Sequence, residues 1–449
     1  MEYQSLQKKH SCFTYQNFSF HFHDSSDFVA VFTYQLENGP TFTHQVIFTQ
    51  IDQELFSQQD PVLINNLIFH LGLVEMLSYW KLAASPTIHI ACGQLNSDQV
   101  KFWQDLLLHG MGEYFYLNQI DSFFHTPPQF IITNQSSSIA LARHSKQPKP
   151  VAAINLGGGK DSAAMLSFMT QKTMPFVNLI VQPASPAAAK MSQNGHPTHF
   201  VQRQFDPQLF QLNHQNYLNG HVPFSATVAF VNLLAAVLYD YDFALVGNES
   251  SADQPSLIWR NQAINHQYSK STKFEQDFEK YRSQYIIKNV KYCSLLRKFN
   301  ELEIAQIFSS NPQFFPIFKS CNCGQQKDLW CHHCSKCLFV FLMLSPFIDE
   351  KILTSKIFSH NLFADSTLLT DCKKLLGLAP AKPLECVGTI EESQLAFYLT
   401  LQKYQQTSLT LPVILNTLKD DLLNLGIDWP QRQQTLLSHS INDLVLPTL

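Results

Sequence analysis

The sequence predicts an α/β fold built on a doubly wound parallel sheet, with an α+β N-terminal domain before it and a helical C-terminal region after it. Continuous apolar runs at 151–156, 175–182 and 242–247 have the composition of parallel strands that are buried on both faces. Helical patterns alternate with these runs, as they do in parallel α/β sheets. The expected domains are 1–148, 149–345 and 346–449.

The N-terminal domain is predicted to combine an antiparallel sheet with helices. Apolar and polar residues alternate in 13–23, 27–36 and 43–51, and turn-forming residues separate these runs, as in strands joined by hairpins. Pro61 opens a helical pattern, at the first helical position that proline favours. Further patterns predict a strand at Thr87–Ala91 and a helix at Ser97–Gly110.

A polar stretch at 134–150, NQSSSIALARHSKQPKP, is predicted to be a linker or a surface excursion. The pattern at 226–240 is apolar almost all round, so this helix should be buried. The other helices expected beside and beyond the parallel strands lie at 163–169, 273–286, 301–308 and 338–347, with several short ones after them.

Composition narrows the classes of function. Of 449 residues, 45% are hydrophobic and 15% are charged, which favours large buried cores over a disordered chain. The 31 Lys and Arg against 35 Asp and Glu leave a net charge of −4, so no broad basic surface for nucleic acid is expected. The N-terminus lacks an apolar signal segment and the apolar run at 338–344 is too short to span a bilayer, which predicts a soluble, cytoplasmic protein.

The most specific motif is a glycine-rich loop between a predicted buried strand and a helix. Glycines let the backbone approach a ligand closely and adopt positive φ. N–H groups at a helix start attract anions, to which Ser162 adds a hydroxyl and Lys160 a charge. We therefore predict a phosphate site, the alternative being a plain glycine turn capped by Asp161. The loop is Gly157-Gly158-Gly159-Lys160-Asp161-Ser162, which matches neither G-x-x-x-x-G-K-[ST] nor G-x-G-x-x-G.

This loop resembles the S-G-G-x-D-S pyrophosphate loop of the N-type ATP pyrophosphatases. Gly157 stands where that family usually has serine, so one hydroxyl contact is missing. The resemblance implies a doubly wound sheet of the N-type ATP pyrophosphatase kind. It also implies that ATP is split into AMP and diphosphate and that the adenylyl group is transferred to an oxygen of the substrate.

Two polar segments follow the loop. Gly247–Ser251 ends the third buried strand, and ligands of such sheets bind outside the carboxyl ends of strands, so Glu249 is expected to meet substrate or Mg²⁺. The segment NHQYSKS is dense in hydrogen-bonding side chains, among them His266, Tyr268 and Lys270. The alternative for both segments is an ordinary polar loop.

Five of the ten cysteines lie within 321–337, at the spacing C-x-C-x7-C-x2-C-x2-C. In a long chain this crowding predicts a metal site rather than disulfides, and four thiolates can close a tetrahedral zinc site. An iron–sulfur cluster, a ligand from His332 or His333, and free core thiols are the alternatives. Spacing leaves Cys321 out, and the predicted ligands are Cys323, Cys331, Cys334 and Cys337, a set that resembles the zinc site of 7-cyano-7-deazaguanine synthase.

Taken in order, these motifs resemble the UDP-N-acetylmuramoyl-L-alanyl-L-glutamate epimerase family. The resemblance covers roughly Val151 to Glu392, and NHQYSKS and ECVGT are the motifs that narrow it. It implies that the substrate is the UDP-linked muramoyl dipeptide of peptidoglycan synthesis and that its terminal L-Glu is inverted. It further implies that ATP and water are consumed, that AMP and diphosphate are released, and that Mg²⁺ is required.

Adenylation makes such an inversion chemically accessible. A free carboxylate resists loss of the α-proton because a second negative charge would build beside the first, whereas an acyl-adenylate accepts that charge and an ordinary side-chain base suffices. Cys386 and Glu385 in PLECVGT are candidate acid/base residues, and His266 and Tyr268 are candidates for the second base. A buried cysteine is otherwise usually inert.

Two other functions fit the same motifs. One is adenylation followed by amide, nitrile or thiol transfer, as in nucleobase-modifying pyrophosphate-loop enzymes. The other is a zinc-containing nucleotide-binding regulator without catalysis. Turnover of ATP to AMP separates the regulator from both enzymes, and the identity of the product separates the two enzymes.

Overall fold

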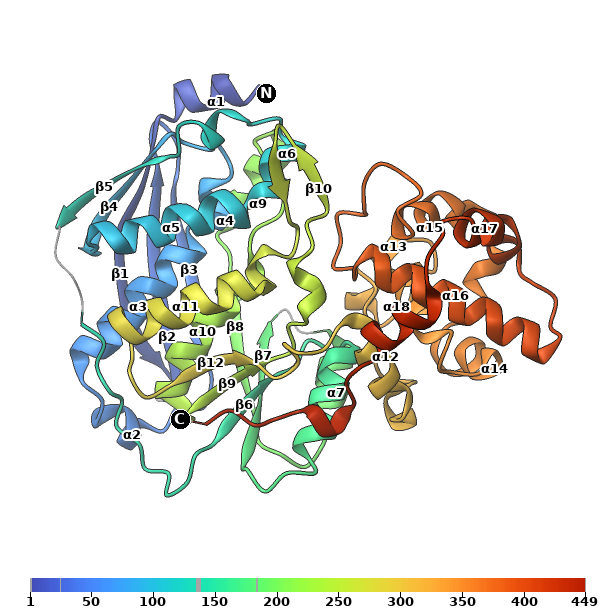
Figure 1. Cartoon of the computed structure of the whole chain (residues 1–449). Helices are drawn as coiled ribbons and strands as arrows, with labels where there is room; N and C mark the ends of the chain where they lie inside the picture. The colour runs from blue at the N-terminus through green and yellow to red at the C-terminus, as the bar shows by residue number, and fades with distance from the viewer. Residues whose placement is uncertain (1, 25, 135–138, 183–184, 449) are drawn as a thin grey trace.

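Ten strands form one mixed sheet in the computed structural model, which describes residues 2–24, 26–134, 139–182 and 185–448 (Figure 1). A separate hairpin pairs β10 (Leu257–Trp259) with β11 (Gln262–Ile264). In spatial order the strands of the large sheet are β12 (Lys291–Ser294), β9 (Phe243–Val246), β6 (Ala152–Asn155), β7 (Phe176–Gln182), β8 (Thr198–Gln204), β3 (Thr41–Phe48), β2 (Asp27–Leu36), β1 (Cys12–His23), β4 (Thr87–Gln94) and β5 (Gln129–Asn134).

The half of the sheet from β12 to β8 is parallel, which confirms the predicted α/β class. Strand β6 lies between β9 and β7, so the chain leaves it in one direction and later returns on the other side. A sheet wound in both directions has a crevice at the carboxyl ends of the two strands where the order reverses. The ends of β6 and β9 therefore mark the place where a ligand is expected.

The N-terminal half continues the same sheet. Strand β3 pairs antiparallel with β8, and β3, β2 and β1 form the predicted hairpins. Strand β1 then pairs in parallel with β4, and β4 with β5. The boundary expected near residue 148 thus falls between strands of one continuous sheet, and the N-terminal region is joined rigidly to the phosphate-loop region.

Helices α2 (Gln53–Ser57), α3 (Pro61–Glu75), α4 (Leu77–Trp80), α5 (Ser97–Gly110) and α6 (Gly112–Leu117) belong to the N-terminal half, after the short α1 (Tyr3–Lys9). Proline stands at the first position of α3 as predicted, and Asp60 caps the helix by accepting from the Val62 N–H at 2.8 Å. In the described part of the chain, one apolar helical stretch, Pro61–Trp80, reaches membrane-spanning length, but 83% of its most apolar window is buried in the protein.

The described part of the predicted linker or surface excursion at 134–150 is mostly exposed and irregular, and one buried arginine anchors it. Arg143 is only 4% exposed, and its guanidinium pairs with Asp240 and with Asp242, the latter at 2.6 Å. These two carboxylates follow α10 (Phe224–Tyr239), so the segment is fixed along the edge of the sheet. The prediction of a linker or surface excursion is confirmed for most of the described segment, which the buried Arg143 anchors to the sheet region; residues 135–138 lie outside the described residues.

The remaining helices confirm the predicted pattern and a helical C-terminal region. Helices α7 (Lys160–Met169), α8 (Pro186–Met191), α9 (Pro207–His214) and α10 flank the parallel half, and α10 is buried against α3. Figure 1 shows the orange and red helices as a second lobe beside the sheet. The helices after the sheet are α11 (Thr272–Tyr285), α12 (Glu301–Ser309), α13 (Ser335–Leu344), α14 (Glu350–Ile352), α15 (Leu369–Leu375), α16 (Ile390–Thr407), α17 (Val413–Leu423) and α18 (Trp429–Leu436).

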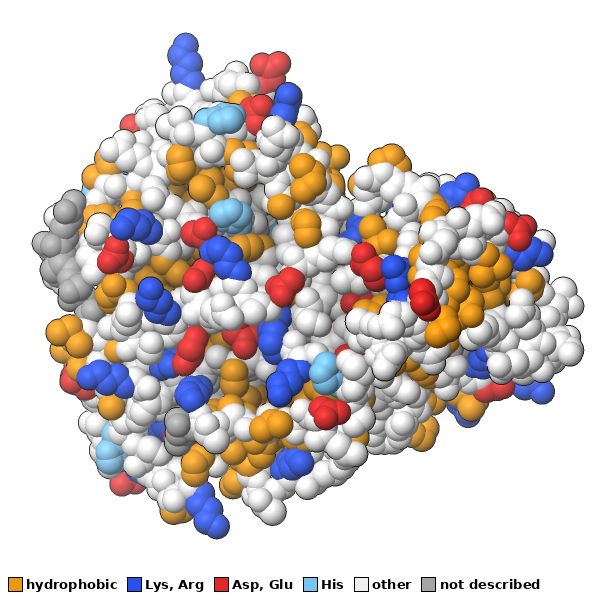
Figure 2. Space-filling view, in the orientation of Figure 1, with side chains coloured by type: hydrophobic (Ala, Val, Ile, Leu, Met, Phe, Trp, Pro, Cys, Tyr) orange, Lys and Arg blue, Asp and Glu red, His pale blue; other side chains and the backbone are white. Residues whose placement is uncertain are grey.

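Two hydrophobic cores correspond to this arrangement. One fills the N-terminal half and the face of the sheet that α10 covers, and the other joins α7 and α12 to the C-terminal helices. The surface in Figure 2 carries both charge signs interspersed, in keeping with the small net charge. Between the two cores, the carboxyl ends of β6 and β9 face loops of the second lobe, and the candidate site is built there.

Candidate active site

The predicted phosphate loop connects β6 to α7, at the reversal point of the sheet. Gly158 has φ +85°, and a Cβ on it would lie 2.5 Å from Ser185 Oγ and 2.6 Å from the Ala188 nitrogen. Both the backbone conformation and the lack of space therefore require glycine at this position. Gly157, in contrast, has nothing within 4 Å of an added Cβ, so the loop is open on that side.

Hydrogen bonds hold the loop in this shape. The Gly157 N–H donates to Ser162 Oγ at 3.0 Å, and the Gly158 carbonyl accepts from the Lys319 N–H at 3.0 Å. Gly159 is the N-cap of α7 and has no side chain to cap it. The first N–H groups of α7 are consequently available to an anion, which the helix dipole also attracts.

A cavity of about 250 Å³ opens beside the loop. Apolar side chains of β7, Leu179 and Val181, line one part of it. Further apolar side chains also line it, and its polar part comes chiefly from three segments that are far apart in the sequence: Gly157, Asp161 and Ser162 of the loop, Gly247 and Asn248 after β9, and Lys270. A pocket with one apolar side and one anion-binding side suits a nucleotide.

Buried carboxylates gather behind the loop. Lys160 is 2% exposed, and its ammonium pairs with Asp161 and with Glu301 at the start of α12. Burial works against its charge, yet these carboxylates raise the pKa of Lys160 above its usual value. Glu249 is 1% exposed, and neither of its carboxylate oxygens has a hydrogen-bond partner. Because buried carboxylates rarely stay unpartnered, the Glu249 oxygens are suited to a cation.

Cys386 lies in the loop between α15 and α16, where the Val387 N–H donates to the Glu385 carbonyl at 2.8 Å. This bond closes a three-residue turn centred on Cys386, whose thiol is half-buried. The Cys386 carbonyl accepts from the ammonium of Lys336, a residue of α13 that is 8% exposed. A tight turn and a buried lysine thus fix the position of the thiol.

His266 is the neighbour of this thiol. Its Nδ1 pairs with the Glu113 carboxylate of α6, and its ring lies close enough to Cys386 for each group to shift the pKa of the other. Burial opposes both charges, but Lys270 and His266 lower the pKa of Cys386 to about 6. Likewise Cys386 and Glu113 raise the pKa of His266 to about 9, against the effect of burial. Near neutral pH the pair is therefore a thiolate and an imidazolium.

The other predicted acid/base residues lie in different surroundings. Burial raises the pKa of Glu385 to about 7, and one of its carboxylate oxygens is buried without a partner. Lys270 lines the cavity, and its positive charge influences Cys386. The Tyr268 hydroxyl donates to Asp105 of α5, and burial together with Asp105 raises its pKa well above the usual value, so it is held as a neutral phenol.

Hydrogen bonds dock the segment around His266 onto the loop around Cys386. The Gln267 side chain donates to the Val387 carbonyl at 3.0 Å, and the Gln254 side-chain oxygen accepts from the Lys382 ammonium at 3.0 Å. Segments more than a hundred residues apart therefore meet through several specific contacts, which places the predicted motifs 265–271 and 383–389 in one site.

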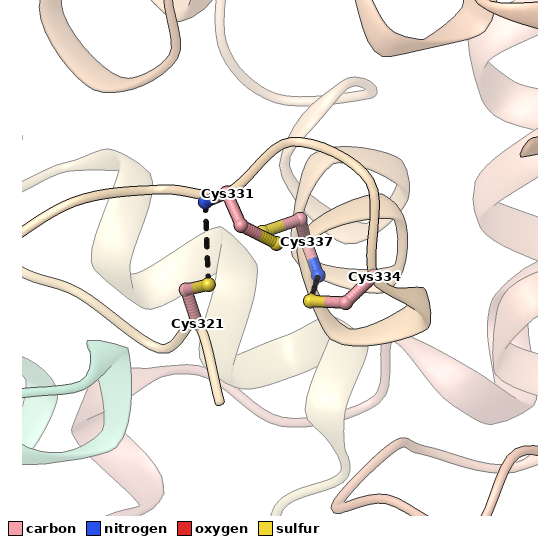
Figure 3. A group of neighbouring side chains, drawn as sticks. All are labelled: Cys321, Cys331, Cys334 and Cys337. Atoms are coloured by element: carbon pink, nitrogen blue, oxygen red, sulfur yellow. Dashed lines mark hydrogen bonds between the residues drawn. The ribbon is translucent and has the colours of Figure 1, made fainter. Parts of the chain in front are cut away.

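The cysteine cluster lies beside this loop, at the N-terminus of α13 (Figure 3). Backbone N–H groups of Gly324 and Cys331 donate to Cys321 Sγ at 3.1 and 3.3 Å. The thiols of Cys321, Cys331, Cys334 and Cys337 all lie within 4.8 Å of one another, as four ligands of one metal ion do.

The fourth member of this group differs from the prediction. Cys321, which spacing had left out, is buried in the group, whereas the predicted ligand Cys323 is exposed beside it. Sequence spacing could not decide between them because two cysteines separated by one residue reach the same place. The ring nitrogens of His332 and His333 contact Ser359 and the Cys331 carbonyl, so the structure does not support a histidine ligand.

Three buried residues of the site escaped the sequence-based prediction: Glu113, Glu301 and Lys336. Glu113 lies in a helix without any motif, and only its contact with His266 reveals it. Glu301 follows an Asn300 cap, where an acidic residue is ordinary. Lys336 lies between Cys334 and Cys337, and a charged residue at the buried, apolar start of a helix was the one available signal.

Comparison with known protein families gives matches over nearly the whole chain. The family model described as MurL N-terminal domain matches residues 4–295, and the one described as MurL C-terminal domain matches residues 317–423. The two matched regions correspond to the sheet with its flanking helices and to the second lobe. Glu113 and His266 fall in the first region and Cys386 in the second.

Three similar proteins carry the name UDP-N-acetyl-alpha-D-muramoyl-L-alanyl-L-glutamate epimerase. The one from Xanthomonas oryzae pv. oryzae (strain MAFF 311018) is 31% identical over 379 residues, which cover 83% of this chain and 82% of the relative. The one from Micromonospora sp. is 30% identical over 408 residues, 89% of this chain and 88% of the relative. The one from Salinispora tropica is 30% identical over 400 residues, 87% and 85%.

Proposed function

The chain belongs to the UDP-N-acetyl-alpha-D-muramoyl-L-alanyl-L-glutamate epimerase family, and from this premise we propose that it inverts the terminal L-Glu of UDP-N-acetylmuramoyl-L-Ala-L-Glu to D-Glu. We further propose that the inversion passes through an acyl-adenylate, with release of AMP and diphosphate, as a cytoplasmic step of peptidoglycan precursor synthesis. The sheet would then be of the N-type ATP pyrophosphatase kind, which the loop and the strand order support.

One observation carries the proposal. Lys270 lines the cavity beside the glycine loop and also lies close enough to Cys386 to lower the pKa of its thiol. A nucleotide in the cavity and a thiolate base would therefore share one site. A carboxylate activated at the nucleotide would have its α-carbon near that base, which is the arrangement that this inversion needs.

The loop residues would hold ATP. The N–H groups at the start of α7 and the Ser162 hydroxyl are suited to the phosphates, and Leu179 and Val181 to the apolar base. Asp161 and the unpartnered Glu249 would hold Mg²⁺, which neutralises phosphate charge when bound. Lys160 is engaged by Asp161 and Glu301, so it supports the loop rather than reaching freely for a phosphate.

Cys386 would remove the α-proton. Its thiolate takes the proton and becomes a thiol, and the electron pair of the C–H bond moves into the adenylated carboxyl group. Lys270 and Lys336 stand near enough to stabilise the negative charge that develops there. Return of a proton to the opposite face inverts the carbon, and water then releases AMP and the free D-Glu carboxylate.

Glu385 is the favoured second acid. Its pKa of about 7 leaves much of it protonated at neutral pH, and one buried oxygen has no partner. His266 interacts with Cys386 closely enough to shift its pKa, so it would stand on the side of the first base and not opposite to it. Tyr268 donates to Asp105 and is a weaker candidate.

The cysteine cluster would hold a structural Zn²⁺. The four thiols crowd together, and without a cation they do not all ionise: a hydrogen bond from Cys337 lowers the pKa of Cys334 to about 4, while burial raises that of Cys331 to about 12. Binding of Zn²⁺ would let all four be thiolates and would stabilise the fold. The ion would fix the start of α13 and with it Lys336.

The test is incubation with ATP, Mg²⁺ and the UDP-dipeptide, followed by AMP measurement and chiral analysis of glutamate. We expect D-Glu with AMP and, in D₂O, deuterium at its Cα. Gly158→Val should abolish AMP formation because its Cβ meets Ser185 and Ala188, whereas the matched Gly157→Ala should reduce it far less. AMP with glutamate wholly in the L form would favour amide or thiol transfer instead, and inversion without ATP would refute the acyl-adenylate.

A further inference from the structure

A carboxylate from the N-terminal half reaches the catalytic thiol through a histidine. Glu113 of α6 pairs with Nδ1 of His266, and only 13% of the His266 side chain and 11% of the Glu113 side chain are exposed. Charges this well shielded from water interact more strongly than surface pairs, and removal of one partner leaves the other buried and unpaired. The contact therefore has a strong influence on the state of His266.

The His266 ring is held on its other sides as well. The His221 ring lies 4.4 Å away at an angle of 43°, and the ligand atoms of Glu113, His221 and His266 all lie within 4.8 Å of one another. The neighbouring residue Gln267 is bonded to Val387, next to Cys386. The imidazole is thus fixed between the carboxylate on one side and the thiol on the other.

We propose that Glu113, His266 and Cys386 form a carboxylate–imidazolium–thiolate relay in which Glu113 is the positioning residue that keeps the histidine protonated and the sulfur ionised. One ring N–H of His266 donates to Glu113, and the charged ring lies near the Cys386 sulfur, whose thiolate it favours. The relay rests on the proposed function only where it assigns the thiolate to removal of the α-proton. The ionisation of Cys386 itself does not depend on the substrate.

The surrounding charges agree with this state. Lys270 and Lys336 face Cys386 and favour the thiolate. Burial lowers the pKa of His221 to about 4, so it is a neutral neighbour, with Lys81 the next cation beyond it. Glu385 is a second carboxyl group that interacts with His266, and its buried position keeps it partly protonated.

The relay also joins the two matched family domains. Glu113 and His266 lie in the region 4–295, and Cys386 lies in the region 317–423. Neither region alone contains both the thiol and the imidazolium that ionises it. The reactive thiolate should consequently exist only while the second lobe is docked on the sheet through contacts such as that of Gln267 with Val387.

The test is the pH dependence of alkylation of Cys386 by iodoacetamide, followed by mass spectrometry of its peptide in the full chain without ATP or substrate. In the unmodified chain we expect the rate to titrate with a midpoint near 6. Glu113→Gln should move the midpoint upward by about one unit, so that the rate at pH 6.5 falls about threefold. Glu113→Asp, which retains the charge, should restore much of the rate.

Asp24→Asn is the matched control, because Asp24 is an exposed carboxylate 3.1 Å from His23, remote in sequence from the site, and it should leave the alkylation profile unchanged. An ordinary thiol midpoint in the unmodified chain, or an unchanged profile in a folded Glu113→Gln chain, would overturn the relay. Elemental analysis gives a second check. A divalent ion that is present in the unmodified chain and absent from Glu113→Gln would also overturn the relay, because a metal-bound nitrogen carries no proton. A shifted profile without D-Glu formation would support the relay and refute the epimerase proposal.

Discussion

Cysteine thiols occur in two opposite electrostatic settings in this chain. The Cys386 thiol is alone among cations, and Lys270 and His266 bring its pKa down to about 6. The thiols of the cysteine cluster face one another, and burial raises the pKa of Cys331 to about 12 while Cys334 alone is lowered. The same functional group therefore has surroundings that suit the proton transfer proposed for Cys386 in one place and the metal binding proposed for the cluster in the other.

The comparison shows that neighbours decide what a thiol can do. Cations that come from both lobes ionise Cys386 without a metal, whereas the cluster thiols need a metal ion for all of them to ionise together. Lys336 belongs to both settings, because it lies between Cys334 and Cys337 in sequence and donates to the Cys386 carbonyl. Variants that change one of these two settings at a time test the comparison.

Replacement of Cys386 should have the largest effect on D-Glu formation. In Cys386→Ser the hydroxyl stays protonated near neutral pH, so D-Glu formation should fall by about 10²–10⁴-fold, the range of general acid–base catalysis. AMP release should fall much less, because the phosphate loop is untouched. Chiral analysis and an AMP assay on the same samples measure both, and D-Glu at the unmodified rate would exclude Cys386 as a base.

Loss of the metal site should mainly destabilise the fold. Cys321→Ser and Cys334→Ser should each remove about one Zn²⁺ per chain and lower the Tm, on the order of 10 °C, because the binding free energy of a structural metal is also folding free energy. Cys323→Ser is the control, since Cys323 is exposed beside the four grouped thiols. Equal losses in all three variants, or iron in the elemental analysis, would contradict this assignment.

The pH profile of D-Glu formation should reflect the base and the acid of the reaction. The rate should rise as pH increases through about 6, where Cys386 loses its proton, and decline above about 7, where Glu385, the proposed second acid, loses its proton. Each flank should change by about tenfold per pH unit. Initial rates of D-Glu formation between pH 5 and 10 provide the measurement, and a rate that first rises near 8.5 would indicate an ordinary thiol.

Removal of single cations should have the smallest effect. Lys270→Met and Lys336→Met should each raise the pKa of Cys386 by about one unit or less, because the remaining lysine and His266 still favour the thiolate. Lys101→Met is the control, since Lys101 is exposed and paired with Asp98. Alkylation of Cys386 as a function of pH measures the shift, and a profile unchanged in both folded variants would show that His266 alone ionises the thiol.

Much of the fold follows from local patterns. Alternating residues predicted β1, β2 and β3, and apolar runs predicted β6, β7 and β9, because burial on one face or on both leaves distinct periodicities. The glycine loop was also predictable, because a run of glycines between a strand and a helix indicates a backbone that needs positive φ or close contacts. Gly158 has both features, with φ +85° and Ser185 close to the position of a Cβ.

Long-range partners were not predictable from these patterns. The sequence does not show that β3 pairs with β8 and merges two regions into one sheet, or that Arg143 is buried against Asp240 and Asp242. Pairing across such separations depends on the summed contacts of whole elements, whereas a local pattern reports only the burial of its own residues.

The sequence by itself determined the chemistry that is available: a loop that approaches phosphates, a group of thiols, and the segments that contain His266 and Cys386. The tertiary structure alone decided which groups meet. It brought Glu113 to His266, chose Cys321 over Cys323, and surrounded Cys386 with cations from two lobes. The physical reason is that the type of a side chain is encoded locally, while its pKa and its partners depend on charges and burial that come together only when distant segments pack.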